Sequence, residues 1–234
     1  MDLTVVYEDK ELLIIHKPAG VATQSGRIGE KDLQSMVMSY LGGSASYAAL
    51  INRLDQPVEG LVLFAKTPQS AKILSEQLTS GTIHKYYLAG CNCAEMEING
   101  NDIGGDVWFD REDYLLQSRK DNSSSIVQKG TSGAKRAFLQ YRYMERKDNC
   151  VLIEVFLHTG RHHQIRVQMS ACGLPLLGDR KYGAGKTGSA EQNYEGKGIA
   201  LCAYRLELVH PKTKKEMNFS ILPQGEWYRQ FRGN

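Results

Sequence analysis

Short runs of apolar and β-branched residues recur along this chain, and no regular alternation of strand-like and helix-like segments separates them. Runs typical of β-strands lie at 3–8, 12–16, 47–52, 61–66, 82–91, 137–143, 151–157, 198–209 and 215–222. Helical spacing is found only at 32–41, 67–80, 160–172 and, for one short helix, 226–231. Many strands with few helices in irregular order predict an α+β fold on a mainly antiparallel or mixed β-sheet with flanking helices.

Some boundaries of these segments are marked by turn and capping residues. Thr67-Pro68 predicts a helix start, with Thr67 as N-cap and proline at the first helical position, and Gly81 predicts its end. Lys147-Asp148-Asn149 predicts a hairpin turn. The stretch 92–133 is polar and turn-rich, and its pattern assigns it to no element.

Composition limits where the protein works. The five cysteines are scattered without a Cys-x-x-Cys pair, which fits reduced thiols better than disulfides or a zinc site. No apolar run approaches the roughly 18 residues that a membrane helix needs, and the first residues lack the pattern of a signal peptide. We therefore expect a cytoplasmic, monomeric protein with one domain over residues 1–234.

Positive charge is concentrated in the second half of the chain. The whole chain has a formal net charge of +3, whereas residues 131–234 alone contain 17 Lys and Arg against 9 Asp and Glu. A surface of this kind suits a polyanion such as RNA, because Lys and Arg contacts to phosphates supply most sequence-independent affinity. A solvated basic surface without a partner is the other interpretation.

Three segments carry more specific information. They are 52–66, with the sequence Asn-Arg-Leu-Asp followed by Gly-Leu-Val-Leu-Phe-Ala-Lys; 85–89, Lys-Tyr-Tyr-Leu-Ala; and 159–167, Thr-Gly-Arg-His-His-Gln-Ile-Arg-Val, followed by 173–179 and 182–183. In order and spacing these segments resemble the RluA-type pseudouridine synthases, from about residue 12 to residue 223. The resemblance implies a catalytic domain with a central active-site cleft and no separate N-terminal RNA-binding domain.

The sequence departs from the family pattern at two places in the first segment. The family commonly has His where this chain has Asn52, and Thr-Ser where it has Val58-Glu59. These departures remove no catalytic residue, but they bear on which RNA loop fits the site.

The resemblance implies that the protein isomerises chosen uridines in ribosomal or transfer RNA to pseudouridine. This reaction breaks the N-glycosidic bond, turns the uracil and rejoins the sugar through C5. Asp55 matches the nucleophile of the family, acting by attack on the sugar, by attack on the base or through a glycal. Uracil leaves as a delocalised anion, so neither a cofactor nor a metal is expected.

Two further residues are expected to act with Asp55. Arg166 matches the arginine that pairs with the nucleophile, where a guanidinium would offset the cost of burying a carboxylate. Tyr87 matches the active-site tyrosine, whose ring would stack on the uracil and whose hydroxyl would assist proton removal. A shift of one residue in the strand would give that role to Tyr86. The alternative for Arg166 is an ordinary surface arginine, and the alternative for either tyrosine is a buried core residue.

The remaining candidates concern RNA contact and packing. The resemblance implies that Arg53 contacts RNA, although a structural ion pair is the alternative. Arg161, His162, His163 and Lys85 are further candidates for RNA binding, and the helix N-terminus beside the two histidines also attracts anions. Leu201 is a candidate for packing under the nucleophile, or an ordinary core residue. The adjacent histidines point about 100° apart on a helix, which disfavours a metal site.

Two other functions compete with this interpretation. A glycoside hydrolase would use Asp55 and Glu59 as its two carboxylates, but nothing else in the sequence supports it. An RNA-binding or RNA-folding protein without catalysis would equally explain the basic residues. Asp55 distinguishes the enzyme from the non-catalytic RNA-binding protein. A negative charge in a phosphate-binding cleft weakens RNA binding, so a carboxylate there makes sense mainly as a reagent.

Overall fold

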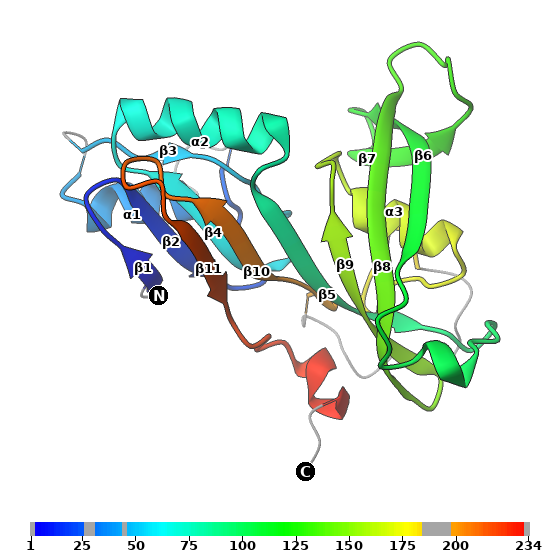
Figure 1. The fold of residues 1–234 in the computed structure, drawn as a ribbon. Helices are drawn as coiled ribbons and strands as arrows, with labels where there is room; N and C mark the ends of the chain where they lie inside the picture. Colours follow the sequence, from blue (N-terminus) through cyan, green and yellow to red (C-terminus); the bar gives the residue numbers. More distant parts are fainter. Residues whose placement is uncertain (1–2, 26–30, 44–45, 184–197, 232–234) are drawn as a thin grey trace. The chain divides into compact units, whose positions relative to one another are not determined.

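The computed structural model describes residues 3–25, 31–43, 46–183 and 198–231, and the chain forms two compact units. Unit 1 comprises Met1–Lys85 and Cys202–Pro223, and unit 2 comprises Tyr86–Leu201 and Gln224–Asn234. The chain passes from one unit to the other within strand β5 (His84–Asn92) and at the start of strand β10 (Leu201–Val209), both labelled in Figure 1, and again between Pro223 and Gln224.

Unit 1 is built on a mixed β-sheet. Its neighbouring strands are, in order, β1 (Thr4–Glu8), β2 (Leu12–Lys17), β4 (Glu59–Ala65), β10 and β11 (Glu216–Ser220), and β3 (Ala49–Leu50) also pairs with β4. The pairs are antiparallel except that β4 and β10 run parallel.

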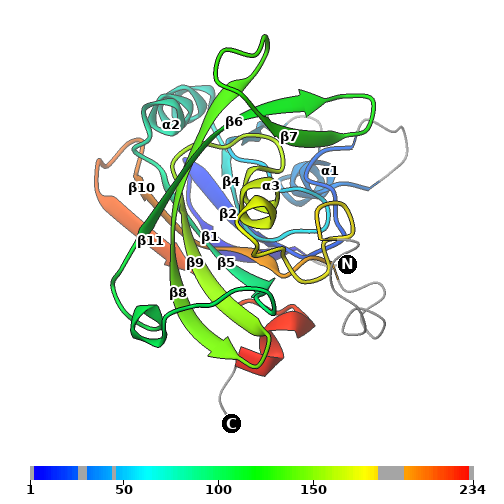
Figure 2. The same cartoon turned by 90° about the vertical axis from the view of Figure 1, so that its right-hand side faces the viewer.

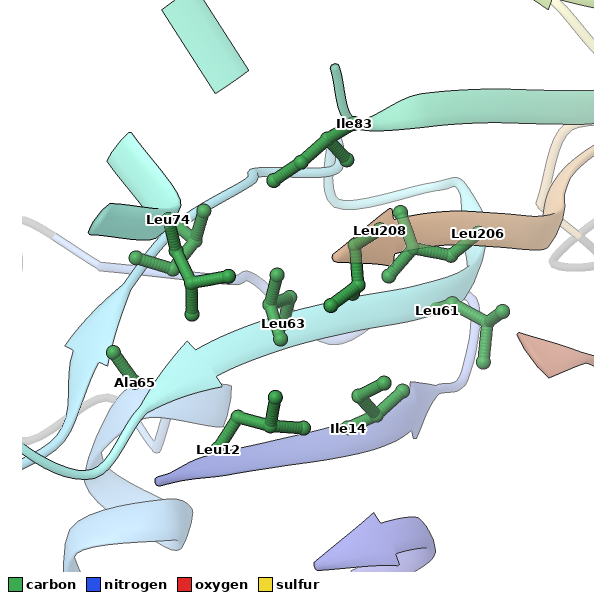
Figure 3. Packing of buried hydrophobic residues seen from close by; sticks show 10 residues of the cluster. Leu12, Ile14, Leu61, Leu63, Ala65, Leu74, Ile83, Leu206 and Leu208 are labelled. Carbon is green, nitrogen blue, oxygen red and sulfur yellow. The ribbon is translucent and has the colours of Figure 1, made fainter. Parts of the chain in front are cut away.

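The core of unit 1 lies between this sheet and helix α2 (Pro68–Ser80), as Figure 3 shows. Leu74 of α2 belongs to the same buried cluster as apolar side chains of the sheet, namely Leu12, Ile14, Leu61, Leu63, Ala65, Leu206 and Leu208. Thr67 caps the helix by accepting the N–H of Ser70, and Gly81 ends it at φ 81°, as predicted. A second helix, α1 (Leu33–Tyr40), begins at Asp32, whose side chain caps it.

Unit 2 is built on antiparallel strands. These are, in order, β5, β9 (Cys150–Leu157), β8 (Lys135–Lys147), β6 (Phe109–Ser118) and β7 (Ser123–Val127). Helix α3 (Gln164–Ala171) contacts β6 and β7 (Figure 2). Its Val167 packs with Leu115 and Ala137. Two short 3₁₀ helices, η1 (Gly100–Asp102) and η2 (Glu226–Phe231), complete the unit.

The predicted α+β fold class is confirmed, with a mixed β-sheet in unit 1, antiparallel strands in unit 2 and few helices. The strand prediction at 47–52 was too long, since only Ala49–Leu50 pair. The predicted helix at 160–172 is also shorter, because His163 has a left-handed backbone at φ 54° and α3 begins after it. Within the residues that the structure describes, no helix is both long and apolar enough to span a membrane.

The hairpin of β6 and β7 lies in the stretch 92–133, to which the sequence assigned no element. The reason is its polarity. On β6, Arg111 and Asp113 form a two-bond ion pair, with distances of 2.6 and 2.9 Å, and Gln168 of α3 donates to the same carboxylate. A strand that carries an ion pair and meets its helix through a polar side chain lacks the apolar alternation by which strands are predicted.

Candidate active site

The proposed nucleophile lies in the loop between β3 and β4 in unit 1. Asp55 is partly exposed and is followed by a tight turn, in which Val58 donates its N–H to the carbonyl of Asp55 at 3.0 Å. The preceding residue, Leu54, is buried, and its backbone bonds to the hydroxyl of Thr23, which donates to the carbonyl at 2.7 Å and accepts the N–H at 3.3 Å. The loop is therefore held from a segment about thirty residues earlier in the chain.

Asn52, where the family commonly has His, also fixes this loop. Its side chain is buried, donating to the carbonyl of Leu61 at 3.2 Å and accepting the N–H of Leu63 at 2.8 Å. Both partners belong to β4, so the amide joins the start of the loop to the strand that follows it.

Lys17 is a functional candidate that the sequence interpretation missed. It ends β2 and is fully buried, and its ammonium donates to the carbonyls of Pro18, Val21 and Gln56 at 3.0, 2.7 and 3.2 Å. Burial lowers the pKa of Lys17 from 10.5 to about 8, while the negative charges of Asp55 and Glu59 act in the opposite direction. A cation therefore holds the residue directly after Asp55. The signal in the sequence was a lysine closing an otherwise buried strand.

The second departure from the family pattern, Val58-Glu59, lies inside unit 1. Val58 and Glu59 are both buried, and Glu59 Oε2 lies 3.8 Å from His16 Nε2, which is also buried. Gly60 follows at φ 136°, and a Cβ atom there would lie 2.5 Å from the backbone nitrogen of Ala203 in β10. Only glycine permits so close an approach of β4 to β10.

Arg53 and Lys85, two candidates for RNA contact, differ in exposure. Arg53 is exposed in the loop before Asp55, as a residue that meets a ligand must be. Lys85 is partly buried in β5, and this burial lowers its pKa.

Tyr87 and Tyr86 are adjacent in β5, so their side chains point to opposite faces of the strand. Tyr87 pairs with Val155 of β9 and is 6% exposed. Tyr86 pairs with Phe156, and their rings stack with centroids 4.7 Å apart. The register thus gives the two tyrosines different surroundings in unit 2.

Arg166 lies on α3 and is buried. Its Nε and Nη2 atoms donate to the two carboxylate oxygens of Asp179 at 2.7 and 2.9 Å, and Asp179 is fully buried. The N–H groups of Lys181 and Tyr182 donate to the same carboxylate at 3.0 and 3.2 Å. The Tyr182 ring lies beneath the guanidinium, 5.1 Å from centroid to Arg166 Cζ. This arrangement fixes the plane of the guanidinium.

Asp179 is a second residue that the sequence interpretation did not single out. It lies in the segment 173–179, which was quoted for the family resemblance but given no role. A Gly-Asp pair after the helix of Arg166 was the signal that could have found it.

The residues before α3 lie around the same loop. His163 is buried, and its Nδ1 lies 2.8 Å from the hydroxyl of Tyr182. His162 is partly buried and stacks on His163, with ring centroids 3.7 Å apart. Arg161 is exposed, and its Nε donates to the carbonyl of Arg136 at 2.8 Å. Of these three candidates, Arg161 is the one with an exposed side chain.

Leu201, the candidate for packing, is the first residue of β10 and is 4% exposed. No group of three or more His, Cys, Asp or Glu side chains in the described part of the chain could hold a metal ion. The five cysteines are all free thiols.

The chain was compared with known proteins by sequence. A model of the RNA pseudouridylate synthase family matches residues 11–171. The uncharacterized RNA pseudouridine synthase YhcT of Bacillus subtilis is 30% identical over 217 residues, which cover 91% of this chain and 66% of that protein. The ribosomal large subunit pseudouridine synthase D of Zymomonas mobilis is 30% identical over 233 residues, covering 95% of this chain and 70% of that protein. The chain thus spans about two thirds of the length of these two relatives.

A relative of similar length is the tRNA pseudouridine synthase C of Haemophilus ducreyi, which is 26% identical over 240 residues, covering 99% of this chain and 95% of that protein. Among solved structures, human RNA pseudouridylate synthase domain containing 4 shares the fold, with a TM-score of 0.73 at 22% identity. That match covers 94% of this chain and 89% of the human chain. By the family model and by these relatives, this chain belongs to the RNA pseudouridylate synthase family, as an RNA-modifying isomerase of the RluA type.

Proposed function

We propose that this protein converts specific uridines to pseudouridine in ribosomal or transfer RNA, in the cytoplasm, as a monomer whose two units form one catalytic domain. The names of the Zymomonas and Haemophilus relatives support these two classes of RNA. The basic second half of the chain supports a polyanionic substrate.

Asp55 is proposed as the nucleophile, after the target nucleotide has been turned out of its stack. In the reaction the bond from C1′ to N1 breaks and a bond from C1′ to C5 forms. C5 loses its proton and N1 gains one, so no atom is lost and no cofactor is needed. Attack on the sugar and attack on the base are both compatible with this balance.

The observation that carries this proposal is the anchoring of the Asp55 loop. Thr23 holds Leu54 on one side of Asp55 and Lys17 holds Gln56 on the other, each by hydrogen bonds to backbone atoms. A carboxylate held in this way needs little reorganisation before it attacks.

Arg166 and Tyr87 are proposed as the other catalytic residues, Arg166 as the cation that pairs with Asp55 and Tyr87 as the ring that stacks on the uracil. The rigid environment of Arg166, with Asp179 and Tyr182, supports a role that depends on direction. Arg53, Lys85, Arg161, His162 and His163 are proposed to serve RNA binding, and Leu201 to pack beneath Asp55. For the two histidines, their internal contacts favour an indirect role through the shape of the α3 N-terminus.

The test uses large-subunit ribosomal RNA and transfer RNA transcripts that contain uridine tritiated at C5. Asp55→Asn should abolish tritium release and leave RNA binding within about twofold of wild type, since the carboxylate is a reagent rather than a ligand. Asp110→Asn, at an exposed acid of β6, is the control and should keep wild-type activity. Turnover that survives in Asp55→Asn would exclude this nucleophile, and a wild-type protein that binds RNA without releasing tritium would favour the non-catalytic alternative.

The target can be found in cells. Pseudouridine mapping across total RNA from cells with and without the gene should show one or a few positions that lose the modification. Positions confined to messenger RNA would contradict the proposed substrate class.

A further inference from the structure

The turn between β6 and β7 carries two exposed cations, Arg119 and Lys120. Within the described part of the chain, neither head group makes a hydrogen bond or an ion pair. The one acid of the turn, Asp121, accepts a hydrogen bond from the hydroxyl of Ser118 at 3.0 Å. The turn therefore presents two adjacent positive charges to solvent without an acidic partner for either.

Polar side chains of this turn and of the start of β7 attach it to the N-terminal end of α3. The Ser124 hydroxyl donates to the carbonyl of His162 at 2.8 Å and lies 3.0 Å from its Nδ1. The other ring nitrogen of His162 lies 3.2 Å from Asn122 Oδ1. His162 lies directly before His163, the N-cap of α3. Its contacts thus join the β6–β7 hairpin to the start of the helix.

The loop after α3 is attached to the same turn. Lys181 donates to the carbonyls of Asp121 and Asn122 at 2.7 and 2.9 Å. The Ser124 N–H donates to the hydroxyl of Tyr182 at 2.8 Å. A polar hairpin turn at the surface is ordinarily mobile, and these bonds remove much of that freedom.

We infer that the β6–β7 turn is a phosphate-binding element for the RNA substrate, with Arg119 and Lys120 as its contacts. This inference rests on the proposed function, because it takes RNA as the partner. Two neighbouring cations without acidic partners fit a phosphate backbone. Because the turn is already fixed, little conformational entropy is lost when phosphate binds.

The position of the turn gives the contact a consequence. Lys181 and Tyr182 hold the turn, and the carboxylate of Asp179, in the same loop, accepts their N–H groups while it holds Arg166. A phosphate bound at the turn is thereby placed in a fixed relation to Arg166 within unit 2. The turn serves to set the register of the RNA on this unit.

The first experiment measures binding of large-subunit ribosomal RNA and transfer RNA transcripts by filter retention. Arg119→Gln combined with Lys120→Gln should raise Kd about tenfold at about 150 mM salt, and should lower the slope of log Kd against log salt by one to two, at about 0.9 for each phosphate contact. Tritium release at RNA concentrations below Kd should fall by a similar factor, because less RNA is bound.

Arg146→Gln combined with Lys147→Gln is the matched control. These two residues are also an Arg followed by a Lys. They lie beside the β8–β9 turn, at the end of β8 that is far from the β6–β7 turn. Its Kd and salt slope should stay close to wild type. The inference would be overturned if the Kd of the Arg119 and Lys120 variant rose no more, relative to wild type, than the Kd of this control.

Ser124→Ala tests whether the fixed position of the turn matters. It removes the two side-chain contacts with His162 and changes no charge. Kd should rise about threefold with an unchanged salt slope, because the slope counts phosphate contacts whereas Kd also includes the cost of ordering. Wild-type affinity in this variant would contradict a preformed element.

The outcomes separate this inference from the proposed function. If wild-type protein releases no tritium but the Arg119 and Lys120 variant still binds RNA more weakly than its control, only the proposed catalysis fails. If tritium release is normal and the two double variants bind RNA equally well, only the role of the turn fails.

Discussion

Lys17 shows how one buried charge can serve a neighbouring loop. Burying a lysine ammonium away from solvent costs free energy unless its N–H groups donate hydrogen bonds. Here three backbone carbonyls accept those hydrogen bonds. One of those carbonyls belongs to Gln56, the residue directly after Asp55. The same hydrogen bonds that offset the cost of burial therefore also fix the position of Gln56.

The depressed pKa of Lys17 predicts a particular pH dependence of stability. Because the pKa is about 8 in the folded protein and 10.5 ordinarily, the unfolded chain binds more protons between these values. The free energy of unfolding contributed by this group therefore rises from pH 8 to 10.5, by at most about 3 kcal/mol. Urea unfolding of wild type and Lys17→Met across this range should show wild type gaining stability relative to the variant. A constant difference between the two would contradict the assignment.

Asp179 is proposed as a positioning residue, because it acts on Arg166 rather than on the substrate. Asp179→Asn removes the negative charge that accepts two hydrogen bonds from the buried Arg166 guanidinium, so the protein should lose about 3 kcal/mol of stability. Turnover should also fall by about tenfold or more while KM for RNA stays within about threefold, since each 1.4 kcal/mol of lost transition-state stabilisation is a factor of about ten.

A second ion pair in unit 2, which is partly exposed, supplies the control for this prediction. Arg111 and Asp113 also form a two-bond ion pair. Asp113→Asn should lower stability without a comparable fall in turnover. Equal losses of turnover in both variants would mean that Asp179 acts only through stability.

At the scale of elements, the parallel contact of β4 with β10 depends on Gly60. A Cβ atom at this position would lie 2.5 Å from the nitrogen and 2.6 Å from the carbonyl oxygen of Ala203. Backbone atoms cannot move aside as a flexible side chain can. β4, which follows the Asp55 loop, can therefore approach β10 this closely only because residue 60 has no side chain.

Gly60→Ala should lower the free energy of unfolding by more than about 3 kcal/mol, since it combines a steric clash with an unfavourable backbone conformation. Gly81→Ala is the matched control, because Gly81 also has a positive φ, of 81°, but a Cβ atom added there would meet no other atom within 4 Å. That variant should lose only about 1 kcal/mol. Urea denaturation compares the two, and similar losses would show that the contact with Ala203 can relax.

At the scale of the whole molecule, the asymmetry of charge governs association with RNA. Residues 131–234 hold 17 of the 29 Lys and Arg and only 9 of the 26 Asp and Glu. Long-range attraction of this kind is screened by salt over about 10 Å at moderate ionic strength.

RNA affinity should therefore fall steeply with salt, with a slope of log Kd against log salt of about 4 or more if at least four or five phosphates are contacted. Filter retention of the transcripts from about 50 to 300 mM salt measures it. A slope below about 1 would show that the basic residues of the second half do not meet the RNA backbone.

The sequence by itself determined the fold class, the family and the loop that carries Asp55. These follow from local patterns, such as the alternation in β9 or the capping residues Thr67 and Gly81, which need no knowledge of distant contacts. The β6–β7 hairpin escaped because Arg111 and Asp113 occupy positions where strands ordinarily carry apolar side chains.

Only the tertiary structure decided the surroundings of the candidate residues. It gave Arg166 the partner Asp179, buried Lys17 against the carbonyl of Gln56, and attached the β6–β7 turn to Lys181, some sixty residues later. The physical reason is that a charged side chain takes its partner and its pKa from groups that folding brings together. Those groups are set by packing, and spacing along the chain does not reveal them.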